Sequence, residues 1–335
     1  MGAFLLAKKE KKIFATFLFC ASVFLFVSPY FILPQIYAGR GNWTDTAPPN
    51  AALLELWEID TFEGGSASRA KFLERRAYAF QKDTFSSYVF VRSLSLSQAK
   101  TMLSGGAKPD LVSFGIGAGE LLEPFCVPLS VETSVRSDLL QCGIVNGNVL
   151  AIPWCVGGYC LCADSGLGGF ELNARNEFSI GTGGVYNVAN LALPKELNKI
   201  ASTYTQFEAY EAYLRGEFDI LLGTQRDFYR LNKKVESGVI GPVNYTYLSA
   251  YTDLIQVISV CSNDNKAVAE KFIEYLLTPT SQACLVDIGL FSVINVSIYN
   301  DIYKDFENSI IQPKTTLNVF TKNENIKSLQ GGGNG

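Results

Sequence analysis

Hydrophobic and polar positions alternate between two patterns along the body of the chain. Short apolar runs, which are typical of buried strands, occupy 53–59, 88–91 and 110–114. Apolar residues recur at helical spacing between them, over 66–83 and 95–104. This strand-helix-strand-helix-strand order predicts an α/β fold with a mostly parallel sheet and right-handed crossovers.

A further strand, predicted over 218–222, turns at Gly223 directly into a helix. Thr224 is a good N-cap residue, because its hydroxyl can accept a hydrogen bond from the first turn. Gln225, Arg226 and Asp227 then lie where a strand ends and a helix begins. Ligands of open α/β sheets bind at such positions.

The first 38 residues have the pattern of a membrane-targeting segment. Four lysines between Lys8 and Lys12 precede an uncharged stretch from Ile13 to Leu33, which is long enough to span a bilayer as a helix. A secretory signal cleaved after Ala38 is the alternative. Both alternatives place the body of the protein outside the cytoplasm, and 39–50 is predicted to be a linker.

Composition excludes several classes of function. The 335 residues include no histidine, which rules out a Ser-His-Asp triad, a Cys-His pair and an HExxH zinc site. The net charge is −4, and no basic block follows the N-terminal segment, so we expect no nucleic-acid partner. Gly115, Gly117 and Gly119 have the wrong spacing for a dinucleotide-binding loop and are expected to form a turn.

Eight cysteines raise the question of a metal site. Cys160 and Cys162 share one face of a strand, Cys155 precedes a Gly-Gly turn, and no histidine can complete a zinc site. We therefore expect no metal and no cofactor. Most of the cysteines are expected to be small buried residues, and a disulfide between Cys126 and Cys142 stays an open alternative.

Three separated motifs resemble one protein family: ELWEIDTFEGGSASRAKFLERRAYAF, KPDLVSFG and LLGTQRDFYRL. They occur in the same order in the extracellular solute-binding proteins of bacterial ABC importers, in the type II, sugar-binding-like class. AIPW followed by GGYCL resembles the family's crossing between lobes, and FIEYLLTPTSQACLVDIGLFSV resembles its usual return to the first lobe. The resemblance spans roughly 53–293.

The resemblance implies a type II periplasmic-binding-protein-like fold, in which two lobes with mostly parallel sheets are joined by a hinge. It divides the chain into a targeting or anchoring segment (1–38), a linker (39–50), a discontinuous first lobe (51–159 and 253–293), a second lobe (160–252), a C-terminal helical segment (294–326) and a flexible tail (327–335). The second lobe is shorter than in typical sugar-binding members, and 166–190 is rich in Gly and Asn.

The function that the resemblance implies is capture of a small solute, in the first place a carbohydrate, by hinge closure and delivery to the membrane subunits of an ABC permease. The protein would act outside the cytoplasm as a monomer, either membrane-anchored through its N-terminal segment or secreted, and would not be an enzyme. A sensor that presents its closed form to a membrane receptor is one alternative. A glycoside hydrolase is another, because Glu58 and Asp60 project from one face of a strand.

Aromatic rings and polar groups near strand ends suit a sugar, since rings stack on C–H faces and polar groups bind hydroxyls. We expect no catalytic residues, and we expect ligand contacts from Glu58, Asp60, Phe62, Phe114, Trp154, Tyr159, Gln225, Arg226, Asp227 and Tyr251. A positive side chain is unfavourable in the first turn of a helix, which suggests that Arg226 pairs with Glu58, Asp60 or the ligand.

Overall fold

The computed structural model describes residues 52–60, 67–84, 87–167, 178–182, 193, 201–204, 208–248, 254–312 and 316–326. The predicted N-terminal segment and linker, Phe62, Tyr251 and the tail lie outside these residues. Within them, none of the helices combines the length and the apolar character that a bilayer crossing needs.

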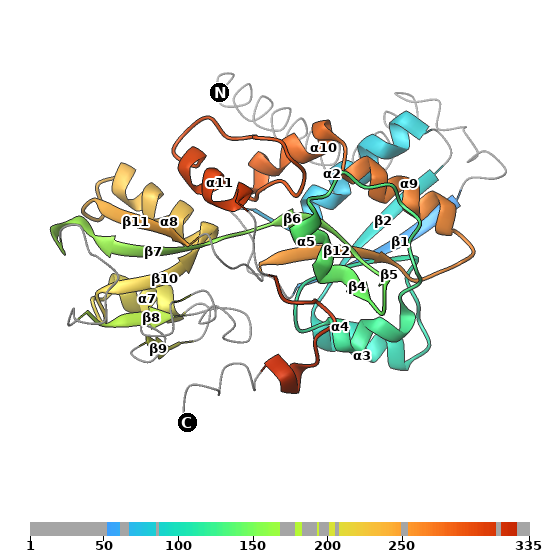
Figure 1. Cartoon of the computed structure of the whole chain (residues 1–335), viewed down its shortest axis with the longest axis horizontal. Helices are drawn as coiled ribbons and strands as arrows, with labels where there is room; N and C mark the ends of the chain where they lie inside the picture. The colour runs from blue at the N-terminus through green and yellow to red at the C-terminus, as the bar shows by residue number, and fades with distance from the viewer. Residues whose placement is uncertain are drawn as a thin grey trace, which may run out of the picture. The chain divides into compact units, whose positions relative to one another are not determined.

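The first sheet contains five strands in the order β2-β1-β3-β12-β6 (Figure 1). Its strands are β1 Ala52–Ile59, β2 Ser87–Leu94, β3 Leu111–Phe114, β6 Ile152–Val156 and β12 Ile255–Val260. The predicted alternation is confirmed, since α2 Arg69–Thr84 and α3 Leu96–Ser104 join the first three strands. Helix α2 lies on one side of this sheet with α9 Lys266–Leu276, and α3 lies on the other with α4 Gly119–Leu122.

Short elements connect β3 to β6. Asn146 and Gly147 both have positive φ angles, 50° and 80°, and form a hairpin turn, for which an Asn-Gly pair between apolar runs is typical. The elements of this region are η1 Glu123–Phe125, α5 Ser137–Leu140, η2 Gln141–Gly143, β4 Ile144–Val145 and β5 Asn148–Val149. After β12, α9 is followed by α10 Pro279–Ala283 and η5 Cys284–Ile288, as the motif in this region predicts.

The second sheet contains five strands in the order β11-β7-β10-β8-β9. Its strands are β7 Tyr159–Asp164, β8 Ile180–Thr182, β9 Ala201–Thr203, β10 Ile220–Thr224 and β11 Val243–Leu248. The helical elements beside it are η3 Ser165–Leu167, α7 Glu208–Leu214 and α8 Gln225–Glu236. The predicted strand-to-helix turn is confirmed, because β10 ends at Thr224 and α8 begins at the next residue.

Both sheets are mixed, so the prediction of mostly parallel sheets is confirmed only in part. In the first sheet β12 runs antiparallel to its neighbours β3 and β6, and in the second β7 runs antiparallel to β10 and β11. The other pairs, β1 with β2 and β3, and β8 with β9 and β10, are parallel. The reversed strands are the ones by which the chain enters a sheet after leaving the other sheet. Such a strand starts at the edge where its neighbours end.

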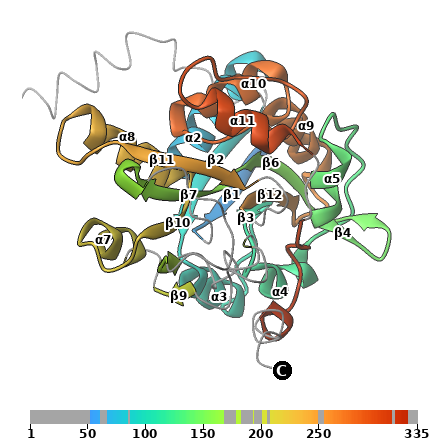
Figure 2. The ribbon, with the colours of Figure 1, turned by 60° about the vertical axis from the view of Figure 1, so that its left-hand side comes forward.

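The C-terminal part returns to both sheets. Helix α11, Lys304–Ile311, lies next to β11 (Figure 2), and Phe306 stacks on Tyr247 with ring centroids 4.7 Å apart. Further along, Phe320 packs edge-on against Phe114 of β3 at 5.7 Å, and the Val319 amide donates to the Cys142 carbonyl at 2.8 Å. Burial of these rings holds the C-terminal segment on the first sheet.

Gly119 determines how closely the C-terminal segment around Val319 and Phe320 can approach helix α4. A Cβ atom there would lie 2.0 Å from the Val319 carbonyl oxygen and 2.7 Å from the Phe320 Cα atom. These are backbone atoms, so Gly119→Ala should displace the segment and lower the free energy of unfolding by about 1–3 kcal/mol. Urea unfolding of the purified protein measures this change.

Gly105→Ala is the matched control, because its Cβ would meet nothing closer than the Met102 carbonyl oxygen at 3.4 Å. We expect the control to change the free energy of unfolding by less than about 0.5 kcal/mol, as surface substitutions usually do. Equal effects of the two substitutions would contradict the close backbone approach at Gly119.

Candidate functional site

The chain passes from the first sheet to the second through Gly157 and Gly158, which separate β6 from β7. The Gly158 amide donates to Gln225 Oε1 at 2.8 Å, and the Gln225 amide donates to the Gly158 carbonyl at 3.2 Å. A Cβ atom on Gly157 would lie 2.5 Å from Gln225 Oε1. Glycine is therefore required, because the Gln225 side chain lies directly against this backbone.

The crossings lie at the carboxyl edges of both sheets. Tyr159, the first residue of β7, pairs with Thr224 and Leu248, the last residues of β10 and β11. Ile255, the first residue of β12, pairs with Val156 at the end of β6. This topology brings together the strand ends at which open α/β sheets bind their ligands.

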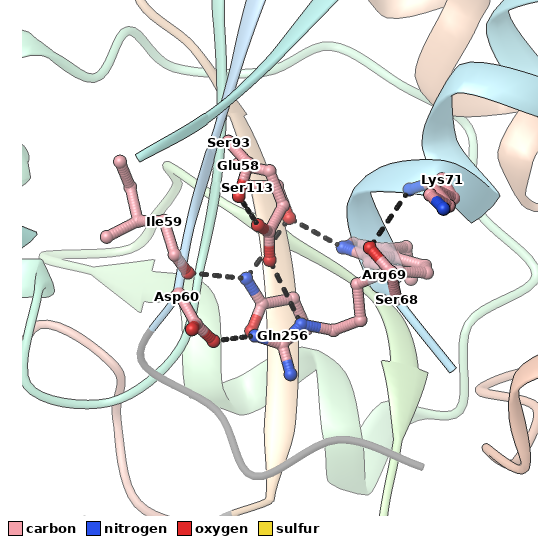
Figure 3. Close-up of polar contacts among 10 residues, drawn as sticks. Glu58, Ile59, Asp60, Ser68, Arg69, Lys71, Ser93, Ser113 and Gln256 are labelled. Carbon is pink, nitrogen blue, oxygen red and sulfur yellow. Dashed lines mark hydrogen bonds and ion pairs between the residues drawn. The ribbon is translucent and has the colours of Figure 1, made fainter. Parts of the chain in front are cut away.

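Arg69, the first residue of α2, binds two carboxylates at the end of β1 (Figure 3). Its Nε atom is 3.0 Å from Glu58 Oε1, and its Nη2 atom is 2.7 Å from Asp60 Oδ1. The Ser93 hydroxyl donates to Glu58 Oε2 at 3.2 Å. Glu58 and Arg69 are buried, whereas the Asp60 side chain is 73% exposed. The group has a net charge of −1, and Asp60 presents that charge to solvent.

A second polar group lies beside it, around Ser113 of β3 and Gln256 of β12 (Figure 3). The Ser113 hydroxyl accepts hydrogen bonds from Trp154 Nε1 at 3.0 Å and from Gln256 Nε2 at 3.2 Å. Gln256 Nε2 also lies 3.5 Å from the Ile59 carbonyl. Gln256 Oε1 is buried and has no hydrogen-bond partner in the described part of the chain. A buried unpaired acceptor costs about 1–3 kcal/mol.

Two of the predicted contact residues, Glu58 and Asp60, thus lie in one polar group. Both pair with Arg69, an arginine that the sequence prediction did not include. The reasoning applied to Arg226 also fits Arg69, because both are arginines in the first turn of a helix that follows a strand. Gln256 was also missed, since its contact with Ser113 spans 143 residues of sequence.

Three of the five predicted aromatic contacts are core residues in this structure. Phe114 and Trp154 have no exposed surface, and Tyr159 is 1% exposed. Trp154 stacks on Phe72 with ring centroids 5.5 Å apart and an interplanar angle of 11°. Their ring faces are therefore covered by protein. Phe62 and Tyr251 lie outside the described residues.

The residues after β10 build the start of α8. Asp227 Oδ2 accepts from the Thr224 amide at 2.9 Å, and Thr224 Oγ1 accepts from the Arg226 amide at 3.3 Å. Burial raises the pKa of Asp227, while the Thr224 amide, Arg230 and Arg226 oppose that shift. Asp227 completes a capping box, Gln225 binds the crossing, and Arg226 is half-buried beside them.

The cysteines form no cluster suited to a metal among the described residues. Cys160 and Cys162 do share a face of β7, with their sulfur atoms 3.6 Å apart. Cys126 and Cys142, the possible disulfide pair, are both free thiols, and Cys142 is fully buried.

Comparison of this architecture with solved structures identifies the fold. The sugar-binding protein MalE from Xanthomonas citri superposes with a TM-score of 0.63 at 13% identity, over 84% of this chain and 91% of MalE. Iron-bound HitA from Pseudomonas aeruginosa gives 0.59 at 15% identity, over 84% and 99% of the two chains. The chain has the fold of the type II periplasmic solute-binding proteins. The resemblance inferred from the sequence motifs is thereby confirmed at the level of fold.

The solute-binding-protein fold does not by itself name a solute. The spermidine/putrescine ABC transporter substrate-binding protein PotD from Streptococcus pneumoniae also matches, with a TM-score of 0.58 at 13% identity over 84% of this chain and 99% of PotD. No protein-family model matches the chain, and no curated protein sequence matches it. The solute must therefore be argued from the side chains present at the strand ends.

Removal of Arg69 should destabilise this solute-binding-protein fold strongly. Arg69→Met leaves Glu58 buried without its counter-charge, and we expect the free energy of unfolding to fall by about 3–5 kcal/mol. Arg75→Met, on the same helix, removes a pair with Asp287 in which both side chains are about half exposed. That control should cost at most about 1 kcal/mol. Chemical denaturation measures both, and similar losses would contradict the assigned role of Arg69.

Proposed function

We propose that this protein is an extracytoplasmic solute-binding protein that captures a small polar solute and delivers it to an ABC permease. The observation that supports this most is the position of the crossings, which lie at the carboxyl edges of both sheets. The solute would lie in a cleft at these edges and would be enclosed by hinge motion, as in periplasmic binding proteins. The N-terminal segment would export the protein or anchor it, and the body would act as a monomer.

The solute proposed first is a carbohydrate. A sugar hydroxyl readily donates a hydrogen bond to a carboxylate, and the edge of the first sheet presents one. Asp60 exposes its carboxylate to solvent, and Arg69 holds it in place at 2.7 Å. Charged groups strengthen hydrogen bonds to hydroxyls. Because Phe114, Trp154 and Tyr159 are buried, the proposal rests on polar contacts rather than on ring stacking.

A cationic solute is the second candidate, and one observation favours it. The group formed by Glu58, Asp60 and Arg69 has a net charge of −1, and its exposed member is the carboxylate of Asp60. A protonated amine would bind there with a favourable charge interaction. An anionic solute would meet repulsion at the same place.

Hydrolysis is supported less well than binding. Both oxygen atoms of Glu58 are held, one by Arg69 and the other by Ser93. A general acid must present its carboxyl group to the scissile bond, which this arrangement opposes. A sensor that docks on a membrane receptor would use the same solute site as a transport protein. Genes for a permease pair beside this gene would favour transport.

A thermal-shift screen of the full-length protein in detergent tests the proposal. Its probes are mono- and oligosaccharides, polyamines and inorganic anions. A solute at 100 times its Kd should stabilise the folded protein by about 2.7 kcal/mol. We expect stabilisation by a carbohydrate and none by the anions. Stabilisation by polyamines alone would favour a cationic solute over a carbohydrate. Stabilisation by anions alone would contradict both candidates.

Asp60→Asn tests where the solute binds. Loss of a charge-assisted hydrogen bond should weaken binding by about 1.5–3 kcal/mol, which is roughly a 10- to 150-fold rise in Kd. Asp264→Asn, which changes another exposed aspartate, is the control and should leave Kd unchanged. Titration calorimetry measures both, and an unchanged Kd for Asp60→Asn would place the solute elsewhere.

A further inference from the structure

Seven cysteines lie in the described residues, and all are free thiols. Four of them, Cys142, Cys155, Cys160 and Cys162, are fully buried. Burial raises the pKa of the Cys142, Cys155 and Cys162 thiols well above the ordinary value. A buried, protonated thiol is a poor nucleophile, so these cysteines are suited to packing. Cys126, Cys261 and Cys284 differ, because each is partly exposed.

Cys126 and Cys261 lie side by side although 135 positions separate them in sequence. Cys126 follows η1, and Cys261 follows β12. The amide of Val127 donates to the carbonyl of Val260 at 2.9 Å, which holds the two backbones together at the neighbouring residues. Cys126 and Cys261 directly adjoin this bond, one on each segment. This backbone pairing places the two residues opposite each other without a change in the fold.

The interaction between the two residues makes one thiol of the pair more reactive. The neighbouring Cys261 thiol lowers the pKa of Cys126, although burial opposes the shift. In turn, the interaction with Cys126 raises the pKa of Cys261. The thiolate is the species that attacks a disulfide, so Cys126 is the attacking group and Cys261 the second, resolving thiol.

We propose that Cys126 and Cys261 form a disulfide when the protein meets an oxidised thiol–disulfide oxidoreductase outside the cytoplasm. The Cys126 thiolate attacks one sulfur atom of the oxidant's disulfide, and the other sulfur atom leaves as a thiolate. Cys261 then loses its proton and attacks the Cys126 sulfur, which releases the oxidant's second thiolate. Two thiols of this protein are oxidised, one disulfide of the oxidant is reduced to two thiols, and the protons balance.

This bond would close a loop that contains the whole second sheet and both crossings. All strands from β4 to β11, together with β12, lie between the two cysteines. A cross-link across so long a loop removes many conformations of the unfolded chain and so stabilises the folded state. Both cysteines lie beside the first sheet, one after η1 and one after β12, so the bond does not tie the first sheet to the second and hinge motion at Gly157 and Gly158 stays possible.

Cys160 and Cys162 are a second pair of neighbouring cysteines, and their position opposes a disulfide. They are two residues apart on β7, fully buried, and paired with neighbouring strands on both sides. A bond between them would distort a strand in the middle of the ladder. Oxidation is therefore expected at one pair only.

Peptide mapping of the full-length protein tests the proposal directly. Purified protein in detergent is incubated with oxidised glutathione, its free thiols are alkylated, and its digest is analysed without reduction. We expect one cross-linked peptide pair containing Cys126 and Cys261, two hydrogen atoms lighter than the reduced pair. Alkylation of both cysteines after oxidation, or a link from Cys126 to any other cysteine, would overturn the proposal.

Serine variants and melting temperatures provide the controls. Reduction should lower the Tm of the oxidised wild type by about 5–10 °C, on the scale expected for a long-loop disulfide in a chain of this size. It should leave the Tm of Cys126→Ser unchanged, while Cys284→Ser should respond like the wild type. If a serine variant does not fold, the wild-type peptide map still decides. Because no solute is used, failure here would not bear on the proposed solute binding.

Discussion

The hydrogen bonds between Gln225 and Gly158 are the interaction on which the arrangement of the two sheets depends. At this point the backbone passes from β6 to β7, and Gln225 at the start of α8 holds it through one side-chain and one backbone hydrogen bond. The contact is possible only because Gly157 has no side chain to separate Gln225 from this backbone. The chain leaves the first sheet at the end of β6, which lies at the carboxyl edge of that sheet. It then enters the second sheet at the carboxyl edge of β10 and β11, so β7 runs in the direction opposite to these neighbours. The same constraint on the return path explains β12.

The buried guanidinium of Arg69 orders the polar groups at the end of β1. A charge in this position is tolerated because Glu58 is bound at 3.0 Å and Asp60 at 2.7 Å. Arg69 thereby fixes the exposed carboxylate of Asp60 at the edge of the sheet. Fixed polar groups bind a solute with less loss of side-chain entropy than mobile ones. This gives the edge of the first sheet a defined set of hydrogen-bonding partners.

Sequence patterns predict those features of the fold that depend on local periodicity and capping. The strands β1 to β3, the helices between them and the start of α8 at Thr224 all follow from such patterns. Strand direction does not, because an apolar run has the same appearance in a parallel and an antiparallel pair. The sheets were therefore predicted to be mostly parallel, and the structure shows mixed sheets.

The candidate site was predictable only in part, for a similar reason. Glu58 and Asp60 follow from their position at a strand end, but Arg69 and Gln256 depend on contacts between distant segments. Trp154 and Phe114 are of the type that binds sugars, yet sequence cannot distinguish a ring in a cleft from a ring in the core. Their complete burial follows from packing against Phe72 and Phe320. Cys126 and Cys261 likewise become neighbours only through the path of β12.

Closure of the two sheets on a solute, about the crossings at their carboxyl edges, is the motion that the proposed function requires. Small-angle X-ray scattering of the protein, with and without a saturating solute identified by thermal shift, tests this most directly. We expect a smaller radius of gyration when the solute is bound. An unchanged radius of gyration at full saturation would contradict it.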